Sequence, residues 1–420
     1  MIDQDRTPHG RLSDFQSVRA LSEQICEPLA VEDYGLQARV ETSPLKWHLA
    51  HTTWFFETFV LKPFMPGYTP FHPGYEQLFN SYYNSLGNPY PRGQRHLLSR
   101  PTVAEVYDYR HTIDRQVLDL LDSSHCPPEA LARIELGLHH EQQHQELMLT
   151  DLKYNLAQNP LWPCYREARH TPSETSGLRF LSQPGGVLWI GHDPAQGFAF
   201  DNEGPRHQVL VQPFALASRL ITNGEYLEFI QDGGYSRPEL WLADGWNQSL
   251  SQNWQHPLYW QRQGAQWLEF TLHGLQPLSP ELPVTHISYY EADAFARWCG
   301  ARLCTEFEWE SVASQTAISR QGLDFAWLHP TAATAPATLH PLQLFGTTWQ
   351  WTQSAYLPYP GYRATSGALG EYNGKFMCNQ QVLRGSSCAT PPGHSRASYR
   401  NFFYPHDRWQ FTGIRLARDL

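Results

Sequence analysis

One stretch decides the fold of the first half of the chain: Leu138-His139-His140-Glu141-Gln142-Gln143-His144-Gln145-Glu146-Leu147. His140 and His144 are four residues apart, and on an α-helix that spacing places two imidazoles on one face, close enough to share a metal ion. Apolar residues recur with helical spacing on both sides, from Leu131 to Leu152. The stretch therefore predicts a long helix that carries a candidate metal site.

The same residues allow a different interpretation. His140-Glu141-Gln142-Gln143-His144 matches the H-E-x-x-H pattern of zinc proteases, in which Glu141 would act as the general base. Two histidines at this spacing are also found as ordinary surface or core residues of a helix. The density of polar residues in an otherwise apolar helix favours a site.

Composition limits the class of protein. A chain of 420 residues exceeds one ordinary core and predicts two domains. The formal net charge of -10 argues against a nucleic-acid-binding surface. No apolar run approaches the length that spans a bilayer, and the first residues lack the apolar core of a signal peptide. The seven cysteines form no CxxC pair, which indicates reduced thiols and predicts a cytoplasmic protein.

The first half predicts four long helices. The first spans about residues 11–30, and the second begins with Ser43 as N-cap and Pro44 at the first helical position. The third opens with the capping box Thr102-Val103-Ala104-Glu105, and the fourth carries the histidine pair. Four helices of this length form a bundle, in which metal sites are built from side chains on facing helices.

A third metal ligand is available on the second helix. His48 and His51 both lie in Leu45–Glu57, and either could converge with His140 and His144. Three neutral imidazoles leave a divalent metal with open positions, which suits a thiolate, dioxygen on iron, or a zinc-bound water. Spacing alone does not choose between these chemistries.

The rest of the chain, from residue 159 on, has a different sequence pattern. Residues 159–177 predict a linker, and residues 178–420 contain short strands, turns and a few capped helices. Gly186–Gly191 and Gln208–Val211 are predicted strands. Three further capping boxes begin at the following residues: Thr222, Ser288 and Thr305.

At this point the residues resemble known families. Residues 1–158 resemble the DinB-like helical bundle, and residues 178–420 resemble the formylglycine-generating-enzyme-like fold, a variant of the C-type lectin fold, so that an α+β protein is expected. The second resemblance is carried by several motifs: Glu203-Gly204-Pro205, Ile221–Tyr226, Pro283-Val284, Trp298–Glu306, Phe345–Thr352, Leu383–Ser387 and Gly413–Ala417. Together with His140–His144, the chain resembles the sulfoxide synthases of ergothioneine biosynthesis over nearly its whole length.

That resemblance implies a reaction and its cofactor. These enzymes use non-haem iron(II) and dioxygen to join cysteine or γ-glutamylcysteine to C2 of the imidazole of hercynine, and they oxidise the sulfur to a sulfoxide. The family's iron ligands correspond to His51, His140 and His144. The alignment around Trp47–Glu57 favours His51 over His48.

The resemblance also implies substrate contacts. Gln143 and Asn401 match residues that hold hercynine. Phe402 and Phe403 could form part of the wall around its quaternary ammonium, because aromatic faces attract cations. Substrate carboxylates need donors, and the polar loop that follows the second helix offers the guanidinium groups of two arginines, Arg92 and Arg95.

The thiol donor is inferred from two differences within the family. The γ-glutamylcysteine branch carries Trp and then Asp after the equivalent asparagine, whereas this chain has Phe402 and Phe403. Tyr82-Tyr83 resembles the tyrosines of the cysteine-using branch, where one phenol is an acid or hydrogen-bond donor. We therefore favour cysteine as the thiol and Tyr83 as the acid, with Tyr82 as the alternative.

Other functions use fewer of these residues. The same scaffold could make selenoneine or an ovothiol precursor. A zinc protease would leave His51, the polar loop and the second domain without a role. A binding protein without catalytic activity is the third possibility, because lectin-like folds often only bind. Small-molecule substrates are expected, with no nucleic acid and no membrane as partners.

Overall fold

The computed structural model describes residues 8–124, 126–167, 174–318, 322–335 and 340–420, so residues 168–173 of the predicted linker lie outside the described residues. The chain forms two compact units. The first unit contains the residues up to Pro160 together with Asp193–Phe200 and Ala364–Gly374. The second unit contains the remaining three segments: Leu161–His192, Asp201–Arg363 and Lys375–Leu420. Two short segments that follow the helical bundle in sequence therefore belong to the first unit.

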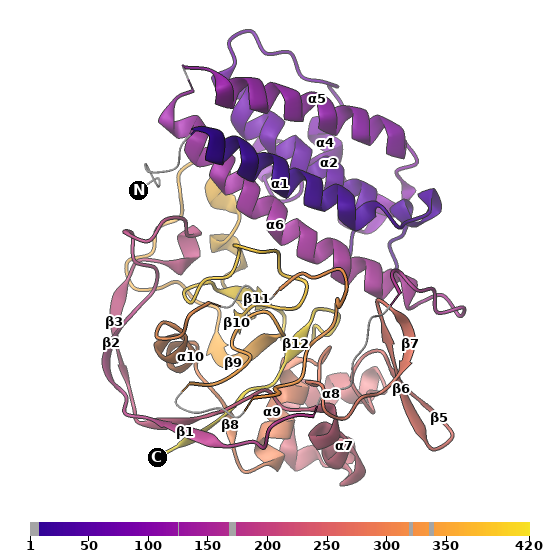
Figure 1. The fold of residues 1–420 in the computed structure, drawn as a ribbon, viewed down its shortest axis with the longest axis vertical. Helices are drawn as coiled ribbons and strands as arrows, with labels where there is room; N and C mark the ends of the chain where they lie inside the picture. The colour runs from indigo at the N-terminus through magenta and orange to yellow at the C-terminus, as the bar shows by residue number, and fades with distance from the viewer. Residues whose placement is uncertain (1–7, 125, 168–173, 319–321, 336–339) are drawn as a thin grey trace. The chain divides into compact units, whose positions relative to one another are not determined.

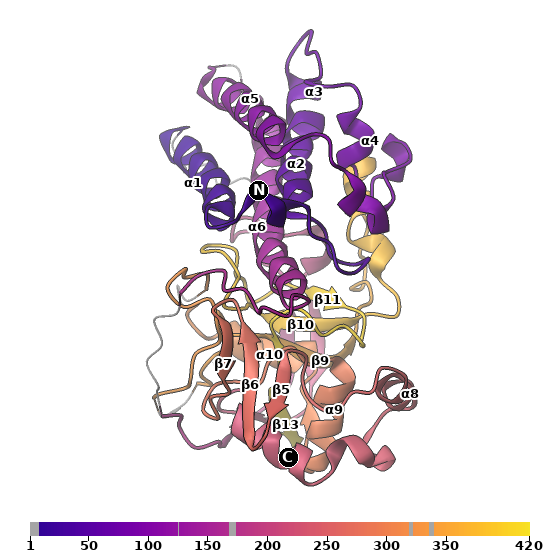
Figure 2. The same ribbon diagram turned by 90° about the vertical axis from the view of Figure 1, so that its right-hand side faces the viewer.

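The first unit is the predicted helical bundle. Its α-helices are α1 (Pro8–Cys26), α2 (Leu45–Phe56), α3 (Lys62–Phe64), α4 (Tyr75–Phe79), α5 (Val103–Asp122) and α6 (Pro128–Leu156). Helices α1, α2, α5 and α6 are the long rods in Figure 1, and α1 and α2 each pack against both α5 and α6. Figure 2 shows α4 beside α2, on the side away from α1.

Local signals account for some helix ends and not for others. The capping box of α5 forms as predicted, because Thr102 Oγ1 accepts from the Glu105 amide at 3.2 Å and Glu105 accepts from the Thr102 amide at 2.6 Å. The prediction that Ser43 caps α2 is wrong, since Pro44 occupies the cap position and no side chain caps this end. The Ser43 amide instead donates to Asp151 Oδ2 at 2.8 Å, and the Ser43 hydroxyl accepts from Arg95. Tertiary partners have displaced the local cap.

Helices α2 and α6 approach closely where α6 has no side chain. A Cβ atom built at Gly137 would lie 2.6 Å from Cε1 of Phe56 and 3.0 Å from Cε1 of Phe55. Beyond Phe56 the chain continues as a π-helical turn, Glu57–Leu61. Such turns are rare and often mark functional sites. The close approach brings one face of α2 against the histidine-bearing face of α6.

The second unit is rich in short strands, as predicted. The strands are β1 (Phe180–Gln183), β2 (Gly186–Ile190), β3 (His207–Val211), β4 (Phe214–Ala217), β5 (Trp260–Gln263), β6 (Gln266–Thr271), β7 (Gly274–Pro277), β8 (Arg302–Leu303), β9 (Trp349–Ala355), β10 (Gln381–Gly385), β11 (Asn401–Phe403), β12 (Thr412–Gly413) and β13 (Leu416–Asp419). They form sheets with the orders β1-β4-β13-β8, β11-β10-β9-β12, β2-β3 and β5-β6-β7. Among the labelled strands, all described pairings are antiparallel except that of β9 with β12.

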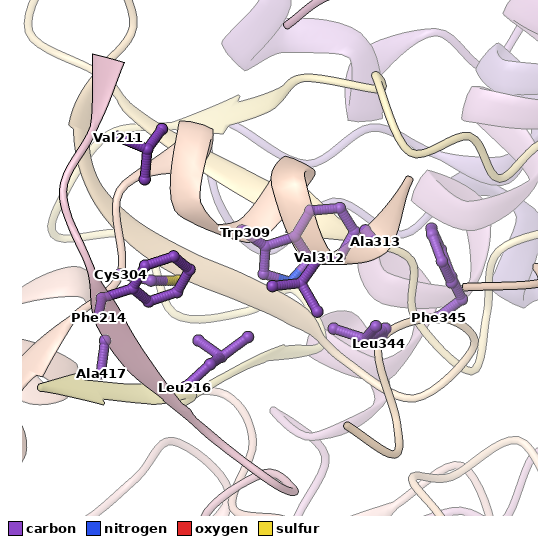
Figure 3. Close-up of a cluster of buried hydrophobic side chains, with 10 residues drawn as sticks. All are labelled: Val211, Phe214, Leu216, Cys304, Trp309, Val312, Ala313, Leu344, Phe345 and Ala417. Carbon is purple, nitrogen blue, oxygen red and sulfur yellow. The ribbon is translucent and has the colours of Figure 1, made fainter. Parts of the chain in front are cut away.

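The described residues of the second unit also form the α-helices α7 (Asn223–Gln231), α8 (Ala243–Ser251), α9 (Tyr289–Trp298) and α10 (Glu306–Ala313). The predicted capping boxes open α7, α9 and α10. Figure 3 shows the core cluster that joins α10 to the first sheet, with Trp309 and Val312 of α10 near Phe214 and Leu216 of β4. The apolar face of α10 therefore closes one side of this core.

Several motifs that carry the second resemblance are structural. Arg384 of β10 is fully buried and pairs with Glu310 at 2.6 Å and with Glu306 at 3.1 Å. Arg415 is also buried, and it donates to Gln350 Oε1 at 2.6 Å. Both guanidinium groups are buried with partners inside the same unit, which indicates a structural role for these residues. Within the described residues, no helix is both long enough and apolar enough to cross a membrane.

Candidate metal centre

Three histidines meet inside the first unit. His51 comes from α2, and His140 and His144 come from adjacent turns of α6. One ligand nitrogen from each of the three lies within 4.8 Å of the other two. The ring centroids are 5.0 Å apart for His51 and His140 and 4.7 Å apart for the other two pairs. This arrangement can hold one metal ion.

The three imidazoles are buried among aromatic side chains. The rings of Trp47 and Trp54 stack on His51, with centroids 4.5 Å and 5.6 Å away, and Phe55 lies 4.7 Å from His140. The three histidines are 1%, 6% and 8% exposed. Burial lowers the pKa of His140 to about 4, and it lowers the pKa values of His51 and His144 well below their usual range, with help from neighbouring histidines. All three rings are therefore neutral at pH 7, the state that binds a metal.

Hydrogen bonds behind the rings orient two of them. Nδ1 of His51 donates to the carbonyl of Phe79 at 2.5 Å, which leaves the Nε2 lone pair of His51 for a metal. His48 Nε2 lies 3.1 Å from Asp151 Oδ2, and His48 Nδ1 lies 2.8 Å from His144 Nδ1. A carboxylate only accepts, so His48 is protonated at Nε2 and accepts from His144 at Nδ1. The Nε2 lone pair of His144 is thus also free for a metal.

These features fit a metal ion held by three neutral ligands. The buried Nδ1 of His140 has no hydrogen-bond partner among the described residues, so no protein group competes for that nitrogen. The metal-ligand group found in the described residues contains only histidines, which leaves the full charge of the ion and its open positions for substrates. His48, the other predicted candidate for third ligand, lies behind His144 as its hydrogen-bond partner.

Glu141 turns into a buried ion network instead. Its carboxylate accepts from Arg19 Nη1 at 2.6 Å, from Arg110 Nη2 at 2.5 Å and from Ser22 Oγ at 2.6 Å. Burial alone would raise the pKa of Glu141, but the two guanidinium groups lower it to about 2. A carboxylate occupied in this way is a poor general base, which counts against the zinc-protease interpretation.

The two arginines of the polar loop lie close to the histidines. Arg95 places Cζ 3.4 Å above the Trp47 ring, the same ring that stacks on His51. Arg92 donates through Nη1 to Tyr82 Oη at 2.9 Å. Within the described chain neither arginine pairs with a carboxylate, and the Nε atoms of both are buried without a partner. Arg95 is buried and Arg92 is half-buried, and neither guanidinium group is in direct contact with a carboxylate, so the two together form a candidate anion site.

The two predicted tyrosines lie in different environments. Tyr83 is buried between Trp54 and Phe59, with centroids 5.6 Å and 5.0 Å away, and burial foremost raises its pKa. Burial also opposes ionisation of Tyr82, but Arg92 and Arg95 outweigh it and lower the pKa of that phenol. At neutral pH Tyr83 keeps its proton, which it needs in order to donate one.

The remaining predicted contacts fall in both units. Gln143 lies on α6, one residue before His144. Asn401, Phe402 and Phe403 form β11 of the second unit. The Phe402 ring stacks on Tyr356 at 4.1 Å, and Asn401 Oδ1 accepts from the Phe402 amide at 2.9 Å.

Two parts of this site were not predicted from the sequence. The first is the relay from Asp151 through His48 to His144, although Asp151 follows His144 by seven residues and so lies on the same helix face. The second is the contact of Glu371 with the loop that carries the tyrosines. No local signal joins residues so far apart in sequence.

The chain is similar to known proteins over most of its length. The family model of the DinB superfamily matches residues 14–148, and that of the sulfatase-modifying factor enzyme 1-like domain matches residues 167–420. A hercynine oxygenase of Mycolicibacterium smegmatis is 32% identical over 411 residues, which cover 90% of this chain and 91% of that protein. A hercynine oxygenase of Mycobacterium tuberculosis is 30% identical over 404 residues, with 90% and 91% covered. Ergothioneine biosynthesis protein 1 of Schizosaccharomyces pombe is 28% identical over 235 residues, which cover 53% of this chain and 28% of that protein.

Proposed function

Because this chain belongs to the hercynine oxygenase family, we propose that it catalyses the oxidative coupling of a thiol to C2 of the hercynine imidazole, with sulfoxide formation. The reaction takes one hydrogen from the thiol and one from C2, consumes one dioxygen, and yields the sulfoxide and one water. The observation that carries the proposal is the convergence of three neutral, buried imidazoles in a chain with such relatives.

Iron(II) is the proposed metal. The residues that would hold it are His51, His140 and His144, each with a ring nitrogen that no described residue occupies by a hydrogen bond. When bound, iron(II) supplies the site for dioxygen and the electrons that begin its reduction. Trp47, Trp54 and Phe55 exclude bulk water from the three imidazoles.

The anion site is the proposed anchor of the thiol substrate. Arg92 and Arg95 would bind its carboxylate through charge-assisted hydrogen bonds, and Tyr82 lies within reach of Arg92. Trp47 contacts both Arg95 and His51, so a small thiol whose carboxylate is bound here would place its sulfur near the histidines. Cysteine is the favoured donor because Phe402 and Phe403 stand where the γ-glutamylcysteine branch has Trp and Asp.

Hercynine would be held by amides and aromatic faces. Gln143 lies beside the metal ligand His144 on α6, and it remains the proposed contact on that helix. Asn401, Phe402 and Phe403 are proposed from the family resemblance, with the two rings as cation–π partners of the trimethylammonium group.

Tyr83 is the proposed proton donor. Its Oη holds a proton at neutral pH because the phenol is buried among aromatic rings. It would deliver that proton as negative charge develops during oxygen reduction. Tyr82 is the alternative. The positive charges of Arg92 and Arg95 lower the pKa of its phenol, which favours a role as a hydrogen-bond partner over a role as a proton store.

The test is direct. Protein purified without air is analysed for metal, loaded with iron(II), and incubated with hercynine, cysteine and air, and the sulfoxide is sought by mass. A parallel reaction with γ-glutamylcysteine decides the donor, and reactions with a selenium donor or with histidine in place of hercynine test the selenoneine and ovothiol alternatives. Absence of a sulfoxide with either thiol refutes the proposal.

Variants assign the roles. His51→Ala should lose both metal and product, whereas His96→Ala, a change at an exposed residue of the same loop region as Arg95, should lose neither. Tyr83→Phe should suppress carbon–sulfur bond formation and divert dioxygen to the thiol, which gains both oxygen atoms and becomes a sulfinic acid. Normal coupling by Tyr83→Phe with loss in Tyr82→Phe would transfer the role to Tyr82.

A further inference from the structure

A segment from the second half of the sequence packs against the loop that carries the tyrosines. Ala364–Gly374 belongs to the first unit and contains the short 3-10 helix Ala368–Glu371. The Glu371 carboxylate accepts from the amide of Asn84 at 2.9 Å and from the amide of Ser85 at 3.1 Å, and it also accepts from the Ser85 hydroxyl. The contact therefore clamps two consecutive backbone groups, 286 and 287 residues away in sequence.

The clamped amides follow directly after the tyrosines. Tyr83 is the residue that precedes the 3-10 turn Asn84–Leu86, and Asn84 opens that turn. From the other side, the Asn80 side chain donates to the Tyr83 carbonyl at 2.9 Å and accepts from the Tyr83 amide at 3.2 Å. The backbone of Tyr83 is thus held by Asn80 before it and by Glu371 after it.

The same segment also reaches the side chain of the first tyrosine. The ring of Tyr372 lies 6.0 Å from that of Tyr82, centroid to centroid. Tyr82 in turn accepts a hydrogen bond from Arg92 of the anion site. Adjacent residues of one segment therefore contact both the backbone after Tyr83 and the ring of Tyr82.

We infer that Glu371 is a positioning residue: by holding the amides of Asn84 and Ser85 it fixes where the phenols of Tyr82 and Tyr83 lie, and so sets how dioxygen is divided between carbon–sulfur coupling and sulfur oxidation alone. The inference rests on the proposed function. Two reactions compete for dioxygen. In coupling, one dioxygen yields the sulfoxide and one water; in oxidation of the thiol alone, one dioxygen yields the sulfinic acid. Glu371 acts on neither substrate, and it acts only through the turn.

The variants remove the clamp in steps. Glu371→Ala removes both acceptor oxygens, and Glu371→Gln keeps one acceptor while it presents an NH₂ donor to the other amide. Glu105→Ala is the matched control, because Glu105 likewise accepts from a backbone amide and a hydroxyl, those of Thr102 at the start of α5. Any effect of losing such a clamp in general appears in the control as well.

Two readouts are needed, and the first does not depend on activity. Hydrogen exchange of metal-free protein should be about tenfold faster or more at the amides of Asn84 and Ser85 in Glu371→Ala, with a smaller increase in Glu371→Gln. The control should exchange at these amides like the original protein. Unchanged exchange in Glu371→Ala would overturn the inference.

The second readout is the product ratio of the iron-loaded enzyme. Glu371→Ala should lower kcat for coupling about 10- to 100-fold and raise the share of sulfinic acid, with KM for hercynine nearly unchanged, because misplacement of a reacting group by about 1 Å costs rate rather than binding. Glu371→Gln should recover part of the loss. Faster exchange with an unchanged product ratio would overturn the positioning role. No sulfoxide from the original protein would refute the proposed function and the catalytic part of this inference, and exchange would still decide whether Glu371 holds the turn.

Discussion

The buried ion network around Glu141 allows a quantitative test. In Glu141→Gln the side chain keeps its volume, but one carboxylate oxygen becomes an NH₂ group and the negative charge disappears. Arg19 and Arg110 then lose the counter-ion that they now contact at 2.6 Å and 2.5 Å, in a region where Glu141 and Arg110 are fully buried. The variant isolates the charge from the packing.

Two arguments give the expected loss in the free energy of unfolding. Lowering the pKa of Glu141 from 4.5 to about 2 corresponds to about 3 kcal/mol of favourable interaction of the ionised form in the folded state. Breaking a buried ion pair by removing one partner costs about 3–5 kcal/mol. For a unit of this size about 3 kcal/mol lowers Tm by roughly 10 °C.

The assay is thermal unfolding of metal-free protein, followed by circular dichroism at pH 7 and at a series of lower pH values. The folded pKa lies below the ordinary value, so the contribution of Glu141 is complete above pH 4.5 and is lost as the pH falls towards 2. The difference in Tm between the original protein and Glu141→Gln should shrink over that window. Glu129→Gln, at an exposed position of the same helix, is the control and should change stability by less than about 0.5 kcal/mol.

One result would refute the reasoning. A Glu141→Gln protein that melts like the original but has lost all turnover would show that the carboxylate acts in chemistry and not in the network. The zinc-protease interpretation requires that outcome. The network requires the opposite, a less stable protein that still binds metal.

Three further predictions follow from other contacts. Asp151→Asn should weaken cobalt(II) binding by metal-free protein about 10- to 100-fold, since it disturbs the relay behind one metal ligand, and an unchanged dissociation constant would contradict that role. Gly137→Ala should destabilise the bundle by about 1–3 kcal/mol, because its Cβ would lie 2.6 Å from the Phe56 ring; equal Tm values would show that the helices separate freely. Iodoacetamide should label exposed Cys378 and spare buried Cys304, whose pKa burial raises to about 12, and mass analysis of labelled peptides at pH 8 would reveal the reverse order if the burial is wrong.

The features of the fold that could be predicted are those set by residues a few positions apart in sequence. Each capping box, including Thr102–Glu105, requires only residues three positions apart, and each forms in the structure. The spacing of His140 and His144 likewise fixes their common face on α6. Local geometry gives these features directly, because a helix converts a short separation in sequence into a direction in space.

The unpredicted part depends on contacts between distant residues. Ser43 resembles a helix cap, yet its amide is taken by Asp151, 108 residues away. Glu141 matches a protease base, yet Arg19 and Arg110 come from other helices to neutralise it. The partner of a polar group is decided by packing, and the sequence pattern around that group does not contain it.

The two indole rings that stack on His51 have an optical consequence. Trp47 and Trp54 are two of the fifteen tryptophans, and their centroids lie 4.5 Å and 5.6 Å from that imidazole. A paramagnetic ion seated on His51 would quench the emission of these two indoles far more than that of tryptophans farther away. The protein therefore carries an intrinsic fluorescent reporter of the occupancy of its own metal centre, readable without any added dye.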